Sequence, residues 1–500
     1  MTQLPVLIKR VLCSNLPLPF DHPLTIPTLI VITSLSTLAY FYMKAIHAAY
    51  LMETTRRHNI NKRRQLERPE DRFASLKVGK RFVNPFEEWQ DVAFLTTALF
   101  WLRRWKGNGL PKTQEELEQT LPVHIPALDT IFTGHGNGST DEHDHKAAPT
   151  DSLGSKGILS SSSSSTVTSP AKNPITFTWF GQSTCLITID GLAILTDPVF
   201  SRCSINDYLG PKRLRPIPCP LDDFEKDLDI VLVSHDHFDH LDEKVVYQLG
   251  NSVTWYIPLG LRNWFLKRNV SNVVEMDWWQ EIQHSSRPDI TIACVPAMHW
   301  SGSRTPFEKN GTLWGSYVVK GREDSVFFCG DTGYSPELFK AIGNMYAPFT
   351  LAAIPIGSFK PEPMMQHVHM GPGDAIKVHM DLKKPRLSVG IHWGTFMMSD
   401  EHYLEPPQTL ARLWKQQQDQ QTHWITDLGI DSTLSLPSPP KESKDIHDPH
   451  SSTDYAAQSF TSPSTSSTTT SSNDTGGKAA STDHRSQFVT TAFGETVVID

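Results

Sequence analysis

The sequence is poor in cysteine and has no excess of basic residues, and each of these features narrows the class of protein. Its six cysteines are scattered without a CxxC motif or a close pair (Cys13, Cys185, Cys203, Cys219, Cys294 and Cys329). Such spacing is typical of a reducing compartment or of buried free thiols, and argues against a disulfide framework. A formal net charge of −8 lacks the basic footprint of a nucleic-acid binder, so we expect no nucleic-acid partner.

Long apolar runs are scarce as well, and one stands out near the N-terminus. Residues 25–43 (TIPTLIVITSLSTLAYFYM) carry no charge and are mostly apolar. As a helix this run would span roughly 28 Å, close to the ~30 Å hydrocarbon core of a bilayer. We interpret it as a transmembrane anchor; a cleaved targeting sequence and a buried core helix are the alternatives.

Basic residues cluster on the C-terminal side of this run. Lys9 and Arg10 precede it, whereas six basic residues follow it (Arg56, Arg57, Lys62, Arg63, Arg64 and Arg68). The positive-inside tendency then predicts a single-pass membrane protein whose large C-terminal part faces the cytosol or the mitochondrial matrix. Residues 1–20 contain no acidic residue, which keeps the mitochondrial inner membrane among the alternatives.

Composition divides the rest of the chain into globular and low-complexity parts. Residues 134–173 are of low complexity, and residues 437–486 are rich in Ser, Thr and Pro, which predicts two disordered insertions. We expect an N-terminal segment (1–24), the anchor (25–43), a basic linker (44–75), a catalytic domain (76–436) that contains the first insertion, and a terminal strand (487–500) that returns to this domain after the second.

The central part of the chain alternates short apolar runs with helical patterns. Runs typical of buried strands lie at 229–233, 290–295, 325–329, 351–355 and 387–391, and helical stretches lie between several of them at 242–248, 336–342 and 373–379. Closer to the N-terminus, residues 87–105 have helical spacing, and Thr113 with Glu116 forms a capping box for another helix. Strands interleaved with helices predict a layered α/β domain.

The stretch VLVSHDHFDHLD at 231–242 concentrates metal-capable side chains just after an apolar run. A loop at a strand end holds its side chains exposed yet rigidly positioned. His235 and His237 are two apart, so an extended turn can direct both imidazoles to one side, and Asp239 and His240 follow in the next turn. The stretch thus supplies two incomplete metal sites, because zinc in catalytic sites takes about four or five ligands.

The missing ligands are predicted at the ends of later strands. His299 follows the run ITIACVPA, Asp331 follows SVFFCG, and His392 lies just after LSVG. A lone histidine after a strand is usually only a hydrogen-bonded polar residue, but three further metal-capable residues in this order favour one shared metal site. Asp197, in LTDPVF, is either a carboxylate that orients a metal-bound imidazole or a turn residue before a proline.

Together these residues resemble the metallo-β-lactamase superfamily, whose fold is an αββα sandwich. The similarity is closer to one branch, the N-acylphosphatidylethanolamine-hydrolysing phospholipase D family, through HDHFDH and the segments GKRFVNPFEEW (79–89), TWFGQSTCLITIDGLAILTDPVFS (178–201), CGDTGY (329–334) and IHWGTFMMSDEHYLEPP (391–407). The resemblance implies two zinc ions: His235, His237 and His299 bind one, Asp239, His240 and His392 bind the other, and Asp331 bridges both.

Physical chemistry supports a pair of ions at such a site. Two cations about 3.5–4 Å apart lower the pKa of a shared water and stabilise a displacement at phosphorus, so a bridging hydroxide would attack a phosphodiester. Asp331 and Asp239 are therefore expected to serve catalysis as well as metal binding. Imidazole and carboxylate ligands suit zinc, and iron and manganese are the alternatives.

The resemblance also places a histidine near the substrate. An ungapped alignment from AAIPIG (352–357) puts it at His369, and His367 is the alternative if the loop shifts. Other candidates for substrate contacts, each of which has a purely structural interpretation, are Trp278, Trp279, Lys212, Arg213 and Arg215.

The leading functional hypothesis is a membrane-anchored, zinc-dependent phospholipase D that releases N-acylethanolamine and phosphatidic acid. The expected partners are a phospholipid substrate and a membrane, and a homodimer is an open alternative to a monomer. A hydrolase of soluble substrates, such as a lactonase, and a non-catalytic lipid-homeostasis protein are the competing hypotheses. A nuclease is disfavoured by the acidic charge balance.

Overall fold

The computed structural model describes residues 22–92, 96–97, 99–100, 102, 113–132, 173–302, 309–427 and 486–500. The chain divides into two compact units, Met1–Trp414 with Ser486–Asp500, and Lys415–Arg485. Nearly all of the two predicted insertions (134–173 and 437–486) lies outside the described residues. Helix α12 (Glu405–Asp427) begins in the first unit.

Two seven-stranded mixed sheets form the body of the first unit. The first sheet has the order β16-β3-β4-β5-β6-β7-β8, and the second has the order β15-β14-β13-β12-β11-β10-β9. In each sheet one half is antiparallel and the other half, β5 to β8 or β12 to β15, is parallel. The parallel halves bring strand ends to one edge of each sheet, where loops can converge.

The strand bounds of the first sheet are β3 (Ile175–Gly181), β4 (Thr184–Ile189), β5 (Leu192–Thr196), β6 (Ile230–Leu232), β7 (Thr254–Pro258), β8 (Val273–Met276) and β16 (Thr496–Ile499). Those of the second are β9 (Glu281–Gln283), β10 (Thr291–Val295), β11 (Ser316–Lys320), β12 (Ser325–Phe328), β13 (Leu351–Pro355), β14 (Leu387–Ile391) and β15 (Gln487–Val489).

Alternation along the strands explains the layering. Ile187 and Ile194 belong to one large core cluster with Val318 and Phe327 of the second sheet, so these faces pack against each other. Their neighbours, such as Leu186, belong to a separate cluster on the opposite face of the first sheet. Because successive side chains of a strand point to opposite faces, each sheet has one inner and one helix-covered face.

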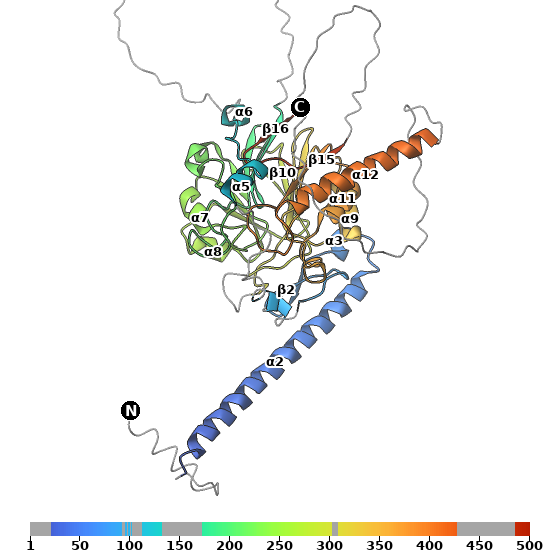
Figure 1. The fold of residues 1–500 in the computed structure, drawn as a ribbon. Coiled ribbons are helices and arrows are strands. Elements are labelled where there is room, and N and C mark those ends of the chain that lie inside the picture. The colour runs from blue at the N-terminus through green and yellow to red at the C-terminus, as the bar shows by residue number, and fades with distance from the viewer. Residues whose placement is uncertain are drawn as a thin grey trace, which may run out of the picture. The chain divides into compact units, whose positions relative to one another are not determined.

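Helices cover the two outer faces. Helices α7 (Glu243–Leu249) and α8 (Arg262–Leu266) lie on the first sheet's side in Figure 1, and α9 (Pro336–Tyr346) and α11 (Pro372–Asp381) lie on the other. The domain is therefore the αββα sandwich that the family resemblance implies. The short elements are α3 (Pro69–Arg72), β1 (Leu76–Val78), β2 (Arg81–Val83), α5 (Gln114–Thr120), α6 (Leu128–Ile131) and α10 (Glu362–Met365).

Most predicted elements are confirmed within a few residues, but the C-terminus forms two strands where one was predicted. The predicted strands at 229–233, 290–295, 325–329, 351–355 and 387–391 correspond to β6, β10, β12, β13 and β14. The predicted single terminal strand is instead two short strands, β15 and β16, one added to each sheet. A turn at Gly494, with φ of 76°, lies between them, so the C-terminal residues join both sheets.

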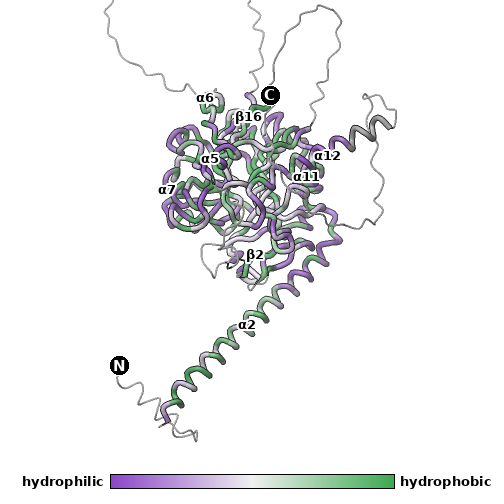
Figure 2. Tube along the Cα trace, viewed as in Figure 1, coloured by the Kyte–Doolittle hydropathy of each residue, from purple (hydrophilic) through white to green (hydrophobic). Residues whose placement is uncertain are grey.

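The N-terminal apolar run is helical but much longer than predicted. Helix α2 (Thr25–Arg63) contains the apolar run and continues through most of the expected linker at 44–75. Figure 2 shows its N-terminal half as mostly hydrophobic and its C-terminal part as largely hydrophilic. It is one helix, among the described residues, that is long and apolar enough to cross a membrane, and its apolar window is not buried.

Two predictions about the following segments have different outcomes. Thr113 caps α5 as expected, because its side chain accepts a hydrogen bond from the Glu116 backbone N–H at 3.1 Å. The helix predicted from residue 87 is wrong at its start, since residues 87–92 form bends and loop. Trp89 is buried in the core there, and this packing overrides the helical pattern.

Candidate metal centre and active site

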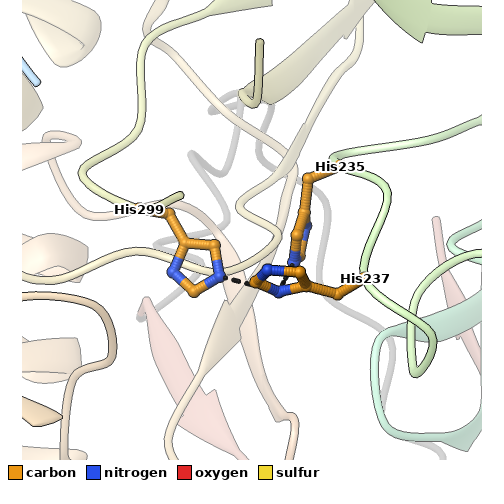
Figure 3. Close-up of side chains that lie close together, drawn as sticks. All are labelled: His235, His237 and His299. Atoms are coloured by element: carbon orange, nitrogen blue, oxygen red, sulfur yellow. Dashed lines mark hydrogen bonds between the residues drawn. The ribbon is translucent and has the colours of Figure 1, made fainter. Parts of the chain in front are cut away.

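The loop after β6 places three histidines around a common point. A turn closes where the backbone N–H groups of His240 and Leu241 donate to the His237 carbonyl at 3.1 and 3.0 Å. His235 Nε2 and His299 Nε2 lie 2.8 and 3.3 Å from His237 Nδ1 (Figure 3). These three rings form the first histidine group, which comes from both sheets, because His299 follows β10.

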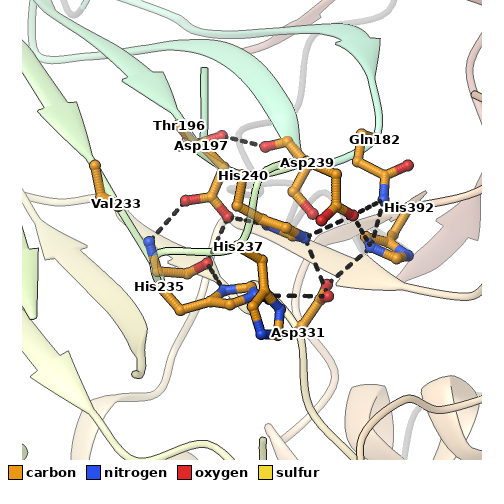
Figure 4. Close-up of polar contacts among 12 residues, drawn as sticks. Gln182, Thr196, Asp197, Val233, His235, His237, Asp239, His240, Asp331 and His392 are labelled. Atoms are coloured by element: carbon orange, nitrogen blue, oxygen red, sulfur yellow. Dashed lines mark hydrogen bonds and ion pairs between the residues drawn. The ribbon is translucent and has the colours of Figure 1, made fainter. Parts of the chain in front are cut away.

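A second group gathers on the other side of the same turn. Asp239 Oδ2 lies 3.5 Å from His240 Nε2 and 3.8 Å from His392 Nε2 (Figure 4). His392 follows β14 of the second sheet and has φ of 61°, an uncommon value for a residue that is not glycine. We call Asp239, His240 and His392 the second group.

Asp331 lies between the two groups. Its carboxylate oxygens are 3.0 Å from His240 Nε2 and 3.1 Å from His392 Nε2 of the second group. The same side chain is 4.0 Å from His235 Nε2 and 3.8 Å from His299 Nε2 of the first. The structure thus brings all seven predicted ligands together, and Asp331 is the side chain that both groups share.

Burial and neighbouring charges shift the pKa values of the histidines in the two groups in opposite directions. Burial, together with the neighbouring imidazoles, lowers the pKa of His235 well below its ordinary value, and burial lowers the pKa of His237 and His299 to about 3. In the second group, burial is outweighed by Asp331 and the neighbouring carboxylates. These raise the pKa of His392 to about 9 and that of His240 well above its ordinary value.

The carboxylates of the centre respond in the opposite sense. Burial alone would raise the pKa of Asp331 and Asp239, but the imidazoles beside them hold both pKa values well below the ordinary range. The first group therefore combines imidazoles of lowered pKa, whereas the second combines carboxylates of lowered pKa with imidazoles of raised pKa.

Asp197 orients the loop from behind. It follows β5, and its Oδ2 lies 2.6 Å from His240 Nδ1. The same carboxylate accepts from the Ser234 backbone N–H at 2.6 Å and from the Ser234 hydroxyl at 2.5 Å. Of the two interpretations of Asp197, the structure favours the one in which the carboxylate fixes an imidazole, as carboxylates behind metal-binding histidines do.

Gln182 is a site residue that the sequence reasoning missed. It occupies the turn between β3 and β4 with φ of 51°, and its side-chain amide donates to Asp239 Oδ2 at 2.6 Å. The same nitrogen lies 2.7 Å from His392 Nε2 (Figure 4). Glutamine is not a usual metal ligand, so only its place between two apolar strand runs could have drawn attention to it.

The two candidate substrate histidines have different surroundings. His369 Nδ1 lies 3.7 Å from Asp331 Oδ2, and its ring stacks on His392 with centroids 5.2 Å apart. His367 instead points toward the Glu88 carbonyl, 2.7 Å from its Nδ1. His369 is therefore the histidine at the metal centre, whereas His367 connects the loop to a neighbouring segment.

The remaining candidates have mainly structural surroundings. The indole N–H of Trp278 donates to the Trp314 carbonyl, and that of Trp279 donates to the Phe73 carbonyl at 3.3 Å. Arg213 is buried and donates to the Ser201, Phe180 and Val199 carbonyls. Arg215 pairs with Glu118 at 3.3 Å, and Lys212 is exposed.

The donor set fits a pair of metal ions. Four groups of three acidic or histidine side chains each have ligand atoms within 4.8 Å of one another (His235–His237–His299, Asp197–His235–His240, Asp239–His240–His392 and His299–Asp331–His369). Nε2 of His237 is buried and has no hydrogen-bond partner among the described residues. Buried polar atoms normally have partners, and a bound metal ion would supply one to this nitrogen.

The chain is similar in sequence to known proteins. Residues 193–393 match the family model of the beta-lactamase superfamily domain. The chain is 35% identical over 370 residues to N-acyl-phosphatidylethanolamine-hydrolyzing phospholipase D 1 of Caenorhabditis elegans, across 71% of this chain and 92% of that protein. It is 34% identical over 353 residues to the mitochondrial N-acyl-phosphatidylethanolamine-hydrolyzing phospholipase D of Saccharomyces cerevisiae, across 68% of this chain and 73% of that protein.

A solved structure is similar at the level of the fold. A metallo hydrolase of the archaeon Ignicoccus hospitalis aligns with a TM-score of 0.37 and 21% identity, across 48% of this chain and 91% of that one. The family model and the two phospholipase D relatives identify the family. The chain belongs to the N-acyl-phosphatidylethanolamine-hydrolysing phospholipase D family of the β-lactamase superfamily and is a metal-dependent phosphodiester hydrolase.

Proposed function

We propose that the protein is a membrane-associated, zinc-dependent phospholipase D that hydrolyses N-acylphosphatidylethanolamine to N-acylethanolamine and phosphatidic acid. The observation that carries this proposal is a mostly apolar cavity whose lining includes His367, two residues before His369 in the same loop. The cavity has a volume of about 820 Å³ and is lined by Gln90, Asp91, Val92, Thr96, Leu99, Phe100, Leu102, Pro361, Pro363, Met364 and His367.

The position of this cavity suits a lipid with long acyl chains. His367 lines it, and two residues later in the same loop His369 lies at the metal centre. Leu99 and Leu102 are exposed large apolar side chains on its wall, and an apolar wall can hold the hydrocarbon part of a ligand. A phosphodiester at the centre could therefore place an acyl chain in the cavity, which favours a lipid over a small soluble ester.

The two groups would divide the metals between them. His235, His237 and His299 would hold one ion, Asp239, His240 and His392 would hold the other, and Asp331 would contribute to both. Two divalent ions at such a site supply an activated water nucleophile and stabilise negative charge on the phosphoryl oxygens. Zinc fits the mixed imidazole and carboxylate donors.

The chain's own residues would orient the phosphodiester. Burial lowers the pKa of His369 to about 3, so at neutral pH its ring is uncharged and offers one N–H donor. We assign this donor to a phosphoryl oxygen of the substrate. Cleavage of the bond from phosphorus to the ethanolamine oxygen leaves phosphatidic acid, and the N-acylethanolamine departs as an alcohol once its oxygen is protonated.

The long N-terminal helix would hold this site at a bilayer. The apolar part of α2 provides a membrane span by length and composition, and the basic residues after it would then face the cytosol or the mitochondrial matrix. The mitochondrial name of the yeast relative favours a mitochondrial membrane.

The test is hydrolysis of N-acylphosphatidylethanolamine vesicles by the purified, zinc-loaded full chain, with metal content measured on the same sample. We expect N-acylethanolamine release with two ions bound. His237→Ala should lose one ion and most of the activity, while Asp374→Ala, which removes an exposed carboxylate paired with Lys377, should change neither. Full metal loading without release of N-acylethanolamine would refute the proposed substrate, while the metal site would stand.

A further inference from the structure

The C-terminal end of α2 carries a buried arginine. The Arg56 side chain is 6% exposed, although the adjacent Arg57 on the same helix is 73% exposed. The Arg56 guanidinium donates to the backbone carbonyls of Asn84 and Phe86 at 3.2 and 2.7 Å and of Trp89 at 3.4 Å. Glu53, three residues earlier, accepts from it at 2.7 and 2.9 Å and holds the guanidinium in place.

The segment that Arg56 holds, residues 84–89, contacts the metal centre directly. Asn84 is buried, and its side-chain amide donates to the His299 carbonyl at 2.7 Å. Four residues later, the Glu88 carbonyl lies 2.7 Å from His367 Nδ1, and the Glu88 carboxylate accepts from the Ser335 hydroxyl at 3.2 Å. The segment therefore touches a residue of the first group and the loop that carries His369.

His299 and the loop that carries His369, both of which residues 84–89 contact, are also in contact with each other. His299 Nδ1 lies 2.8 Å from the Val368 carbonyl, between His367 and His369. A ring N–H directed at a backbone carbonyl fixes the orientation of a metal-binding imidazole and leaves its other nitrogen free to bind. Residues 84–89, His299 and the loop around Val368 thus form a closed set of hydrogen bonds.

Arginines at the end of α2 and directly after it support the same junction. Arg63 donates to the Ala74 and Ser75 carbonyls at 2.6 and 3.5 Å, and Arg64 pairs with Glu87. Phe86 packs on Phe73 and Trp278 in the core. The last turns of α2 are consequently bonded to the catalytic domain, whereas a flexible tether would leave its side chains in solvent.

We propose that Arg56 is a positioning residue of the metal centre. By holding residues 84–89, it fixes Asn84 against the His299 carbonyl and Glu88 against the loop that carries His369. The membrane helix would then be part of the active-site scaffold in addition to being an anchor. The inference rests on the proposed metal-centred hydrolysis, but its decisive measurements need no lipid turnover.

The experiment compares Arg56→Ala with Arg57→Ala in the full chain in detergent. The two variants remove the same charge from adjacent positions, and each breaks an ion pair with Glu53. The measurements are cobalt affinity and the visible spectrum of the cobalt-loaded protein, amide hydrogen exchange of residues 84–89 and 366–369 without metal, sedimentation with vesicles, and turnover of bis(p-nitrophenyl) phosphate.

We expect Arg56→Ala to weaken cobalt binding about tenfold, in the range seen when residues behind a metal ligand are changed. Its cobalt spectrum should change, kcat should fall with KM retained, and both segments should exchange faster. Vesicle binding should match the wild type, and Arg57→Ala should match the wild type throughout. A folded Arg56→Ala protein with wild-type cobalt affinity and spectrum would overturn the proposal.

Two milder variants decide the matter if Arg56→Ala does not fold. Arg56→Lys keeps the charge near Glu53, but one ammonium cannot span three carbonyls, and Asn84→Ala removes the donor to His299. Each variant should weaken cobalt binding severalfold and alter the cobalt spectrum. If both variants have the wild-type cobalt spectrum, the positioning role is refuted. If the wild-type protein binds cobalt normally but releases no N-acylethanolamine, only the proposed substrate is refuted.

Discussion

The two halves of the metal centre share the turn at residues 235–240, yet their histidines differ in pKa. His237 of the first group and His240 of the second are three residues apart, but the pKa of the first is lowered to about 3 and that of the second is raised well above its ordinary value. Burial lowers the pKa of His237, whereas Asp331, Asp239 and Asp197 outweigh burial at His240. The imidazoles of the second group therefore have the higher pKa values, and a metal ion competes with protons there.

The comparison predicts that Asp331 is the one side chain whose loss damages both halves. Asp331→Ala should abolish binding of both ions, because its carboxylate lies beside both groups. Activity should fall about a thousandfold or more, since metal ions contribute several kcal/mol and each ~1.4 kcal/mol is a factor of ten in rate. Metal analysis and turnover of a phosphodiester check this, and one ion retained at full occupancy would contradict the shared role.

The halves should also differ in how metal binding depends on pH. The raised pKa values of His240 and His392, the latter about 9, mean that both rings are protonated at neutral pH. Metal must displace these protons, so affinity for the second ion should rise as pH rises from 6 to 8, by up to about tenfold per unit for each proton released.

The first ion should show little pH dependence over the same range. The pKa values of His237 and His299, about 3, leave both rings unprotonated. Stepwise calorimetric titration of the metal-free protein at several pH values measures both affinities. Equal pH dependence of the two binding steps would contradict the difference in histidine pKa between the two groups.

Asp197 allows a smaller and more selective test. It fixes the His240 ring, so Asp197→Asn should weaken the second ion by about 10–100-fold, the usual cost of losing a carboxylate behind a metal-binding histidine. The variant preserves size, and a matched control is Asp374→Asn on the exposed face of α11. Stronger loss of the first ion than of the second would contradict this assignment.

How far the sequence alone could lead depends on the range of each interaction. Strand and helix periods and the HDHFDH spacing are local, and they predicted a layered α/β domain with a metal site at its strand ends. The family resemblance implied the sandwich and the division of the seven ligands between two ions. Which arginine of a basic helix is buried depends on a segment 28 residues away, so Arg56 was indistinguishable from Arg57 in the sequence. Glu53, three residues before Arg56, was the available signal, but it serves Arg57 equally.

Gln182 escaped prediction for a related reason, and it provides the most delicate test of the two halves. Its amide donates to Asp239 across a distance of 57 residues in sequence, through packing that no local pattern encodes. Gln182→Ala should weaken the second ion about tenfold, because hydrogen bonds to charged groups contribute ~1.5–3 kcal/mol. The first ion should bind as before, since no contact joins Gln182 to the first group among the described hydrogen bonds. Separate affinities from the calorimetric titration decide the matter: an equal loss at both ions would show that Gln182 supports the turn as a whole, and an unchanged second affinity would show that Asp239 needs no such partner.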